Sequence, residues 1–407
     1  MVNSSYWLTN VTLEQGYLVE NEQIVGTKTA VYHLRIDQGK INDIVQGNLP
    51  MASNAPRYDA RELLLLPSFE EGHIHLDKTY YSGPWKAVKP IQSIFDRIEE
   101  EKELLPRILP QSREQAERIL SLIQGFGTTH VRTHCNIEPT SGLHRLAATK
   151  EALRTFSGKL SSEIVAFPQH GLLHSDAVQL VREAMDEGAT LVGGLDPFTV
   201  DGDIERSLQV MVEIAVEKNS GIDIHLHEGG ESGKLTIARL ADLTEEAGLQ
   251  GKVTVSHAFW FASAQPEEAE ELAERMASLR MSVASSVPIG RNPMPLPMLK
   301  KKGVGVTLGT DSLTDHWSPF GLGDQLEKVG RLAELNRYND EFSLSQALGY
   351  ITGGITPLDH EGNQVWPKVG DRANFVLVQA SCAAETVARR STRQAVWYQG
   401  NLVRGSL

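Results

Sequence analysis

Two histidines, His73 and His75, stand two residues apart just after the apolar run LLLLPSFEEG. Side chains alternate faces along a strand, so the two imidazoles would project from the same side, close together. Packing gives no reason to hold two imidazoles in this way, whereas a shared metal ion does. The segment HIHLDKT therefore predicts half of a metal-binding site.

Polar residues of the same chemical kind follow apolar segments later in the chain. GIDIHLHEGG contains His225, His227 and Glu228, VTVSHAF contains His257, and GTDSLTD contains Asp311. Neutral imidazoles and a carboxylate suit a borderline divalent ion such as Zn²⁺ or Fe²⁺ and leave room for water. One isolated His or Asp carries little information, but their ordered occurrence after apolar segments points to a single site.

Eight short apolar segments precede or contain these residues and alternate with amphipathic ones. They end in HIH, VRTHC, VAFPQ, LVGGLDP, IDIHLHE, VTVSHAF, SVASSV and GVTLGTD. The segments between them, such as REQAERILSLIQGF, carry apolar residues at helical spacing. Eight strand–helix units over roughly 290 residues predict an α/β fold of the (β/α)8 TIM-barrel type, with its active site at the C-terminal ends of the strands. A doubly wound open sheet is the alternative, but no glycine-rich phosphate loop follows the first strand.

The two ends of the chain are rich in strand-like segments instead. AVYHLRI and INDIV lie near the N-terminus, and ANFVLVQA and AVWYQGNLV lie near the C-terminus. We expect them to form a small β-sandwich domain built from both termini. The predicted divisions are 1–62 and 357–407 for this domain and 63–356 for the barrel. The acidic run IEEEKELLP between the first two barrel strands is typical of a solvated helix face.

Composition limits the classes of partner. The chain has 407 residues, of which 41% are hydrophobic and 22% charged, as in ordinary globular proteins. A net charge of −13 argues against a nucleic-acid or anionic-membrane partner. No secretory pattern opens the sequence, and no apolar run approaches the roughly 18 residues of a membrane helix. Only Cys135 and Cys382 are present, so a disulfide framework is not expected. We therefore expect a reducing, cytoplasmic location.

The ordered segments HIHLDKT, VRTHCN, VAFPQHG, LVGG, IDIHLHEGG, VTVSHAF and GTDSLTDHWSPFG resemble the amidohydrolase superfamily. They are similar, more specifically, to its branch of cytosine deaminases and N-isopropylammelide isopropylamidohydrolases. The resemblance runs in order from about residue 60 to 360, and the flanking strands are similar to the small β-sandwich of that family.

The resemblance implies a role for each of these positions. The ligands of one divalent metal ion, zinc or iron, would be His73, His75, His225 and Asp311. The catalytic residues would be Glu228 as the proton shuttle, His257 as the group that orients and polarises the attacking water, and Asp311. The substrate-binding residues would be Gln169, Trp317 and Ser312. His227 has no counterpart in that scheme and is expected to be structural.

Two departures from the family refine this expectation. Related binuclear enzymes bridge two metal ions with a carboxylated lysine near the end of the fourth strand, which here ends GGLDP without a lysine. Lys78 lies too near the first strand for that position, so one metal ion is expected. Asp311 is followed by Ser312, where the cytosine deaminases commonly carry a second aspartate, and this puts cytosine itself in doubt. DKT and GGLDP are closer to the branch that acts on substituted aminotriazines.

The sequence thus predicts a metal-dependent hydrolytic deaminase or dealkylaminase of an amino-substituted nitrogen heterocycle. Water activated by the metal would attack a ring carbon, and ammonia or an alkylamine would leave. The resemblance also implies a homo-oligomer. Two alternatives stay open: cleavage of a cyclic or linear amide by the same residues, and a non-catalytic metal-binding barrel. Release of ammonia rather than of a ring-opened acid would separate deaminase from amidase.

Overall fold

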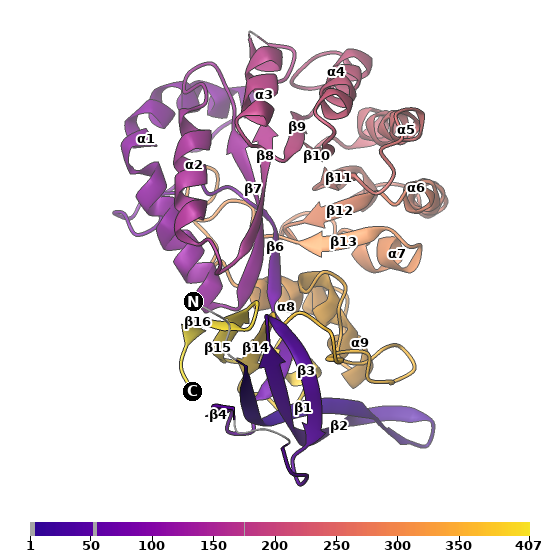
Figure 1. Cartoon of the computed structure of the whole chain (residues 1–407). Coiled ribbons are helices and arrows are strands. Elements are labelled where there is room, and N and C mark those ends of the chain that lie inside the picture. Colours follow the sequence, from indigo (N-terminus) through magenta and orange to yellow (C-terminus); the bar gives the residue numbers. More distant parts are fainter. Residues whose placement is uncertain (1–4, 52–54, 175) are drawn as a thin grey trace.

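The computed structural model describes residues 5–51, 55–174 and 176–407 of the chain. Within these ranges, eight parallel strands form one sheet in chain order (Figure 1). They are β6 (Phe69–Ile74), β7 (Thr128–Asn136), β8 (Ser161–Phe167), β9 (Leu191–Leu195), β10 (Gly221–His225), β11 (Val253–Ser256), β12 (Ser282–Ser285) and β13 (Gly305–Leu308). The Asp311 N–H donates to the His73 carbonyl oxygen at 2.7 Å, and Ile74 and Asp311 form a parallel bridge. The chain after β13 therefore meets β6, and the sheet closes into a barrel.

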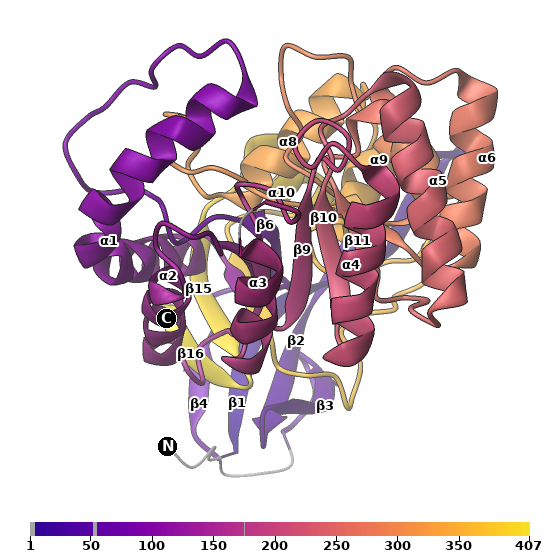
Figure 2. The ribbon, with the colours of Figure 1, turned by 90° about the horizontal axis from the view of Figure 1, so that it is seen from above.

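A helix follows each barrel strand and covers the outside of the sheet (Figures 1 and 2). The helices are α1 (Ile94–Gly125), α2 (His144–Thr155), α3 (Ala177–Asp186), α4 (Ile204–Glu217), α5 (Gly230–Glu246), α6 (Pro266–Ser278), α7 (Leu296–Lys301) and α8 (Gln325–Leu335). Helix α4 illustrates their origin: it begins after Asp203, whose carboxylate accepts the Arg206 N–H, and it buries Leu208, Met211 and Ala215 at helical spacing. The predicted (β/α)8 barrel is confirmed.

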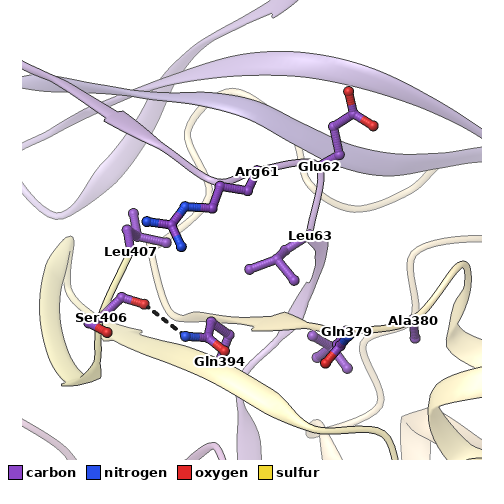
Figure 3. Close-up of a pocket in the computed structure, with 9 residues that line it drawn as sticks. Arg61, Glu62, Leu63, Gln379, Ala380, Gln394, Ser406 and Leu407 are labelled. Atoms are coloured by element: carbon purple, nitrogen blue, oxygen red, sulfur yellow. Dashed lines mark hydrogen bonds between the residues drawn. The ribbon is translucent and has the colours of Figure 1, made fainter.

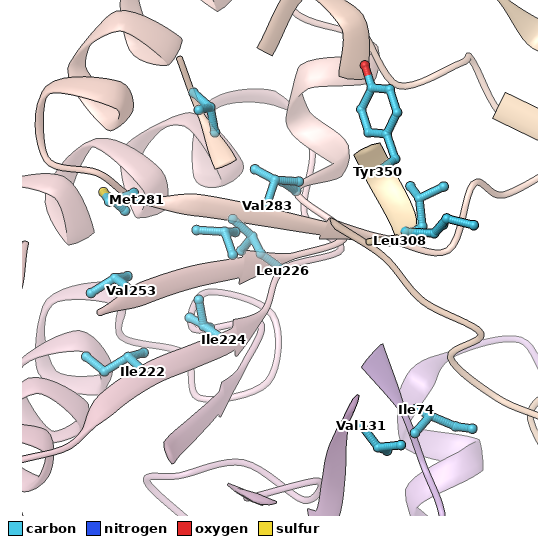
Figure 4. Close-up of a cluster of buried hydrophobic side chains, with 14 of the residues drawn as sticks. Ile74, Val131, Ile222, Ile224, Leu226, Val253, Met281, Val283, Leu308 and Tyr350 are labelled. Atoms are coloured by element: carbon cyan, nitrogen blue, oxygen red, sulfur yellow. The ribbon is translucent and has the colours of Figure 1, made fainter. Parts of the chain in front are cut away.

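The barrel strands separate an apolar layer from a polar interior. On β10, Ile222 and Ile224 belong to the main hydrophobic core (Figure 4). Asp223 and His225 alternate with them and point to the opposite face of the strand. Because the isoleucines pack outward against the helices, the aspartate and histidine face the inside of the barrel. The alternation in GIDIH thus delivers chemically active groups to the interior.

The second sheet combines both ends of the chain. Its strand order is β16-β15-β14-β5-β1-β2-β3, with β4 paired to β1. The strands are β1 (Tyr6–Glu20), β2 (Gln23–Asp37), β3 (Lys40–Gln46), β4 (Arg57–Asp59), β5 (Leu64–Pro67), β14 (Phe375–Val378), β15 (Arg393–Tyr398) and β16 (Asn401–Gly405). Its core includes Phe375 and Trp397, whose rings stack with centroids 5.0 Å apart. The small domain built from both termini is confirmed, as one continuous hydrogen-bonded path. The predicted divisions stay predictions, although β5 lies beyond residue 62 and pairs within this sheet.

Two further α-helices lie outside the eight strand–helix units of the barrel. Helix α9 (Glu341–Ala347) follows α8, and α10 (Ala383–Arg389) lies between β14 and β15. Cys135 and Cys382 are buried free thiols, in keeping with the expected lack of a disulfide framework. No helix within the described ranges combines the length and apolar character needed to cross a membrane.

Glu14 on β1 gives a prediction about stability. Its side chain is buried, Oε1 accepts the Ala383 N–H at 2.5 Å, and Oε2 has no hydrogen-bond partner among the described residues. Burial raises the pKa of Glu14 from 4.5 to about 7. The folded chain therefore holds this proton more tightly than the unfolded chain. The resulting contribution to the free energy of unfolding is complete below pH 4.5 and is lost as the pH rises through 7. Glu14→Gln should raise the free energy of unfolding at pH 8 by about 1–3 kcal/mol and change it little at pH 4.

Urea unfolding at the two pH values measures this effect. Glu20→Gln, on the exposed end of the same strand, is the matched control and should change neither value. Equal stability of Glu14→Gln and the unmodified chain at pH 8 would show that burial does not raise the pKa of Glu14 in the folded state.

Candidate active site

The ends of three barrel strands bring the four predicted metal ligands together. His73 is the penultimate residue of β6, and His75 lies just beyond the end of that strand. His225 ends β10, and Asp311 follows β13. The Nε2 atoms of His73 and His75 each lie 3.5 Å from Asp311 Oδ1. His75 Nε2 lies 3.3 Å from His225 Nε2. Three imidazole nitrogens and one carboxylate oxygen therefore converge on one small volume.

A hydrogen-bonded chain fixes the tautomer of His73. Ser256 Oγ donates to Asp223 Oδ1 at 2.6 Å, because a carboxylate only accepts, and the same hydroxyl oxygen lies 2.8 Å from His73 Nδ1. With its proton committed to Asp223, Ser256 must accept from Nδ1–H. In the neutral ring, the lone pair is then on His73 Nε2, which lies 3.5 Å from Asp311 Oδ1. A carboxylate linked in this way to the far side of an imidazole is the usual support of a metal-ligating histidine.

The imidazoles of His75 and His225 are held neutral. Burial, with help from the charge of Lys78, lowers the pKa of His75 to about 3. Burial and the neighbouring histidines also hold the pKa of His225 well below its usual value. Neutral imidazoles beside an ionised carboxylate are the protonation states that bind a metal ion.

The donor set fits a divalent cation. His73, His75 and Asp311 offer ligand atoms that all lie within 4.8 Å of one another. His73 Nε2 is buried and has no hydrogen-bond partner in the described residues. A cation between this nitrogen and Asp311 Oδ1 would satisfy the imidazole and the carboxylate together. His73, His75, His225 and Asp311 can therefore hold one such ion, and their assignment as ligands stays a prediction.

The backbone around the cluster is constrained in ways that accompany function. His257 and Asp311 both adopt the left-handed region, with φ values of 69° and 65°. Such conformations cost residues other than glycine free energy and are often retained at active sites. Gly309 has a different role, because a Cβ at this position would lie 2.5 Å from the Cβ of His73. Only glycine lets the chain after β13 pass so close to the first ligand.

His257 and His134 extend the cluster on neighbouring strands. The His257 ring lies 5.0 Å from that of His73, centroid to centroid, and neither ring nitrogen has a hydrogen-bond partner among the described residues. His134, at the end of β7, lies 3.9 Å from the His73 ring and is likewise unpartnered. His257 was predicted to orient water and lies where it could do so. His134 received no role from the sequence, although VRTHC marked it as a strand-end histidine.

A cavity of about 200 Å³ opens beside the cluster. The three predicted substrate-binding residues, Gln169, Trp317 and Ser312, all line it, as do His257 and Asp311. Its apolar walls include Phe167 and Leu195. The structure therefore brings these three side chains together around one cavity, and their contact with substrate stays a prediction.

Glu228 is placed differently from the other predicted catalytic residues. It lies three residues after His225 but is not among the residues that line the cavity. Its Oε1 accepts the Thr199 N–H at 2.6 Å, and its buried Oε2 has no partner in the described part of the chain. Burial raises the pKa of Glu228, and the Thr199 N–H opposes that rise. A carboxyl group with a raised pKa and an oxygen without a hydrogen-bond partner is suited to exchange protons.

A buried carboxylate of the acidic run, Glu101, supports one wall of the cavity. Glu101 belongs to the acidic run of α1, which was predicted to be a solvated face, yet its side chain is 0% exposed. It accepts hydrogen bonds from His316 at 2.6 Å and from the Trp317 indole N–H at 2.9 Å, and it lies 3.7 Å from Lys78 Nζ. Lys78 in turn donates to Gln169 Oε1 at 2.8 Å. The prediction of a solvated face is wrong at this position, because one turn of α1 packs against the barrel mouth.

Replacement of Glu101 should be costly for this reason. Glu101→Gln would leave the ammonium of Lys78 buried without its counter-charge, and the free energy of unfolding should fall by about 3–5 kcal/mol. Glu103→Gln on the same helix, where the side chain is 79% exposed, should change it little. Urea unfolding of both variants measures the difference. Equal stability of the two would show that Glu101 is not the partner that allows Lys78 to be buried.

A larger pocket lies elsewhere and lacks such chemistry. It measures about 530 Å³ and is lined by residues of the second sheet and its connections, including Arg61, Gln394 and Ser406 (Figure 3). Gln394 donates to the Ser406 carbonyl oxygen at 3.3 Å, and Arg61 and Glu62 are the ionisable side chains of the lining in the described residues. None of the described residues that line it is a histidine, so the cavity at the barrel mouth is the better candidate site.

Comparison with known proteins agrees with this geometry. Residues 105–404 match the sequence model of the amidohydrolase family. The chain is 47% identical over 405 residues to the uncharacterized protein YahJ of Escherichia coli (strain K12), covering 99% of this chain and 88% of that protein. It is 29% identical over 359 residues to N-isopropylammelide isopropyl amidohydrolase of Pseudomonas sp. (strain ADP), covering 85% and 87%. The structure of N-isopropylammelide isopropylaminohydrolase from Burkholderia multivorans superposes with a TM-score of 0.86 at 28% identity, over 99% of each chain.

Proposed function

The chain belongs to the amidohydrolase family and is a hydrolase of C–N bonds, and we propose that it removes ammonia or an alkylamine from a one-ring, amino-substituted nitrogen heterocycle. The proposal includes one divalent metal ion, zinc or iron, held by His73, His75, His225 and Asp311. The observation that carries it is the convergence, beside a small cavity, of imidazole nitrogens of His73, His75 and His225 with the Asp311 carboxylate. A divalent ion bound there would make water acidic enough to supply a nucleophile at neutral pH.

Glu228 is the proposed carrier of protons. Its free Oε2 can take a proton from the attacking water and pass it to the departing nitrogen, and its raised pKa suits both steps. The hydrogen bond from Thr199 anchors Oε1 and leaves Oε2 to act. Glu228 is not among the residues that line the cavity, so this role requires Oε2 to reach the bound substrate from beside the present lining. His257, buried and unpartnered next to Asp311, can orient the water for attack.

The cavity limits the substrate to a small ring. A volume of about 200 Å³ is below the roughly 300–1,000 Å³ of pockets that take drug-sized ligands. Phe167 and Trp317 offer flat faces, and Lys78 and Gln169 offer donors to a carbonyl oxygen or a ring nitrogen. These features favour an oxo-substituted aminopyrimidine or aminotriazine. The two N-isopropylammelide hydrolases among the similar proteins favour the triazine.

Amine release over a panel of rings tests this function. The metal-loaded protein is incubated with cytosine, isocytosine, other aminopyrimidines and N-alkylated aminotriazines including N-isopropylammelide. We expect release of ammonia or alkylamine from at least one member and none with Glu228→Gln. A ring-opened acid without free amine would favour the amidase alternative. A protein that binds metal stoichiometrically yet turns over no member would contradict the proposed substrate class.

A further inference from the structure

His227 is the polar residue of HLHE that neither the proposed metal binding nor the proposed proton transfer uses. It follows β10 two residues after His225, so both rings lie on the same side of the chain. Its ring lines the cavity beside the cluster. It also stacks on His257, with centroids 4.4 Å apart and an interplanar angle of 28°. The expectation that His227 is merely structural does not account for a polar ring exposed to this cavity.

Asp196 fixes the orientation of the His227 ring. Its Oδ1 accepts the backbone N–H of His227 at 2.6 Å, and its Oδ2 lies 2.8 Å from His227 Nδ1. Asp196 is buried, directly follows β9, and adopts a positive φ of 38°. Because a carboxylate accepts and does not donate, Nδ1 must carry a proton toward it. The ring therefore cannot flip without the loss of this bond.

Nε2 is the polar atom of His227 that remains for a ligand. Across the described residues it makes no hydrogen bond, since the contacts of His227 with polar groups run through its backbone N–H and Nδ1. The other polar groups of the cavity include Lys78 and Gln169, from the chain after β6 and β8. A molecule in the cavity thus meets hydrogen-bonding groups contributed by separate strands.

We propose that His227 is a specificity-determining residue that hydrogen-bonds a ring nitrogen or oxo group of the heterocycle through Nε2, an inference that rests on the proposed function. Asp196 is a positioning residue that acts through His227. The preferred ring then carries polar atoms on two edges, one for Lys78 and Gln169 and one for His227. Oxo-substituted aminotriazines and aminopyrimidines have such edges, whereas a ring with a hydrocarbon edge does not.

Binding to a variant that cannot turn over isolates this contact. In the Glu228→Gln background, calorimetry gives the Kd of N-isopropylammelide and of cytosine with and without His227→Phe. Phenylalanine keeps the aromatic stack on His257 but removes Nε2. We expect a Kd at least roughly tenfold weaker for the better-bound probe, because a buried polar group of the ring is left unpaired. His227→Gln should restore part of the affinity, and His360→Phe, an exposed histidine, should leave the Kd unchanged.

Asp196 supplies a second, independent arm. Asp196→Asn should weaken the same probe, and the double variant with His227→Phe should be no weaker than His227→Phe alone, since Asp196 acts through that ring. Metal content is measured in every variant and should stay the same as in the parent.

The outcomes separate the two proposals. An unchanged Kd in His227→Phe, or a weaker Kd accompanied by loss of metal, overturns the specificity role. Absence of binding by both probes also overturns it, because both rings carry the edges it requires. If His227→Phe weakens binding as expected but the unmodified protein releases no amine from the bound probe, the specificity role stands and the proposed reaction fails.

Discussion

Replacement of Glu228 by glutamine is expected to lower kcat by about 10²- to 10⁴-fold with metal content and stability unchanged. The amide keeps an oxygen that can accept the Thr199 N–H, so the local fold should persist. It cannot accept a proton from water or hand one to a leaving amine. The loss should therefore fall on kcat rather than on the Kd of the substrate, as measured by steady-state kinetics and metal analysis.

The exposed neighbour Glu231 provides the matched control for this variant. Glu231→Gln makes the same chemical change in the first turn of α5 and should leave kcat unchanged. Near-full activity of Glu228→Gln would contradict the shuttle assignment. Loss of activity together with loss of metal would instead place Glu228 among the groups that hold the metal centre together.

Removal of a proposed ligand has the second large expected effect. His225→Ala takes away the nitrogen that faces His75 Nε2 at 3.3 Å. Loss of an outer partner of a ligand typically weakens metal binding by about 10- to 100-fold, so loss of the ligand itself should cost at least as much. We expect substoichiometric metal after dialysis, determined by elemental analysis, and activity that falls in proportion to the metal content.

The stack of His225 on Phe167, with centroids 4.0 Å apart, requires a check that the variant is folded. Far- and near-ultraviolet circular dichroism supplies that check, and His360→Ala on the surface is the control for loss of an imidazole. One metal ion per chain in folded His225→Ala would remove this residue from the ligand set.

The sequence predicted the parts of the site that local periodicity controls. The two-residue spacing of His73 and His75 and the alternation in GIDIH place side chains on one face of a strand, and the structure has that arrangement. Barrel closure then makes the first and last strands neighbours, so that Asp311, which follows the last strand, lies beside the first strand and near His73. These inferences needed only strand alternation and the order of the elements.

The supporting contacts could not be predicted because they depend on packing between distant segments. Glu101 sits in an acidic run that also contains solvated residues such as Glu103, and helical periodicity alone does not mark it as buried. Its burial follows from the position of Lys78 and His316, far away in sequence. The contact between the Asp196 carboxylate and the His227 ring likewise depends on the adjacency of β9 and β10 and on the turn after β9.

Some of this support did leave a signal in the sequence. Asp223 lies two residues before His225 in β10, on the same face of the strand. A buried charged residue needs a polar partner, which here would lie in the barrel interior. Ser256 directly precedes His257 in VTVSHAF. Neither signal, however, indicates that the two side chains join to fix the tautomer of His73.

Titration of the metal-free protein with Zn²⁺ or Fe²⁺, while amine release from the best substrate of the panel is followed, tests the central claim most directly. The site described above predicts no release without metal, a linear rise as metal is added, and a plateau at one equivalent per chain. Amine release by the metal-free protein, or a plateau only at two equivalents, would contradict a single metal centre formed by His73, His75, His225 and Asp311.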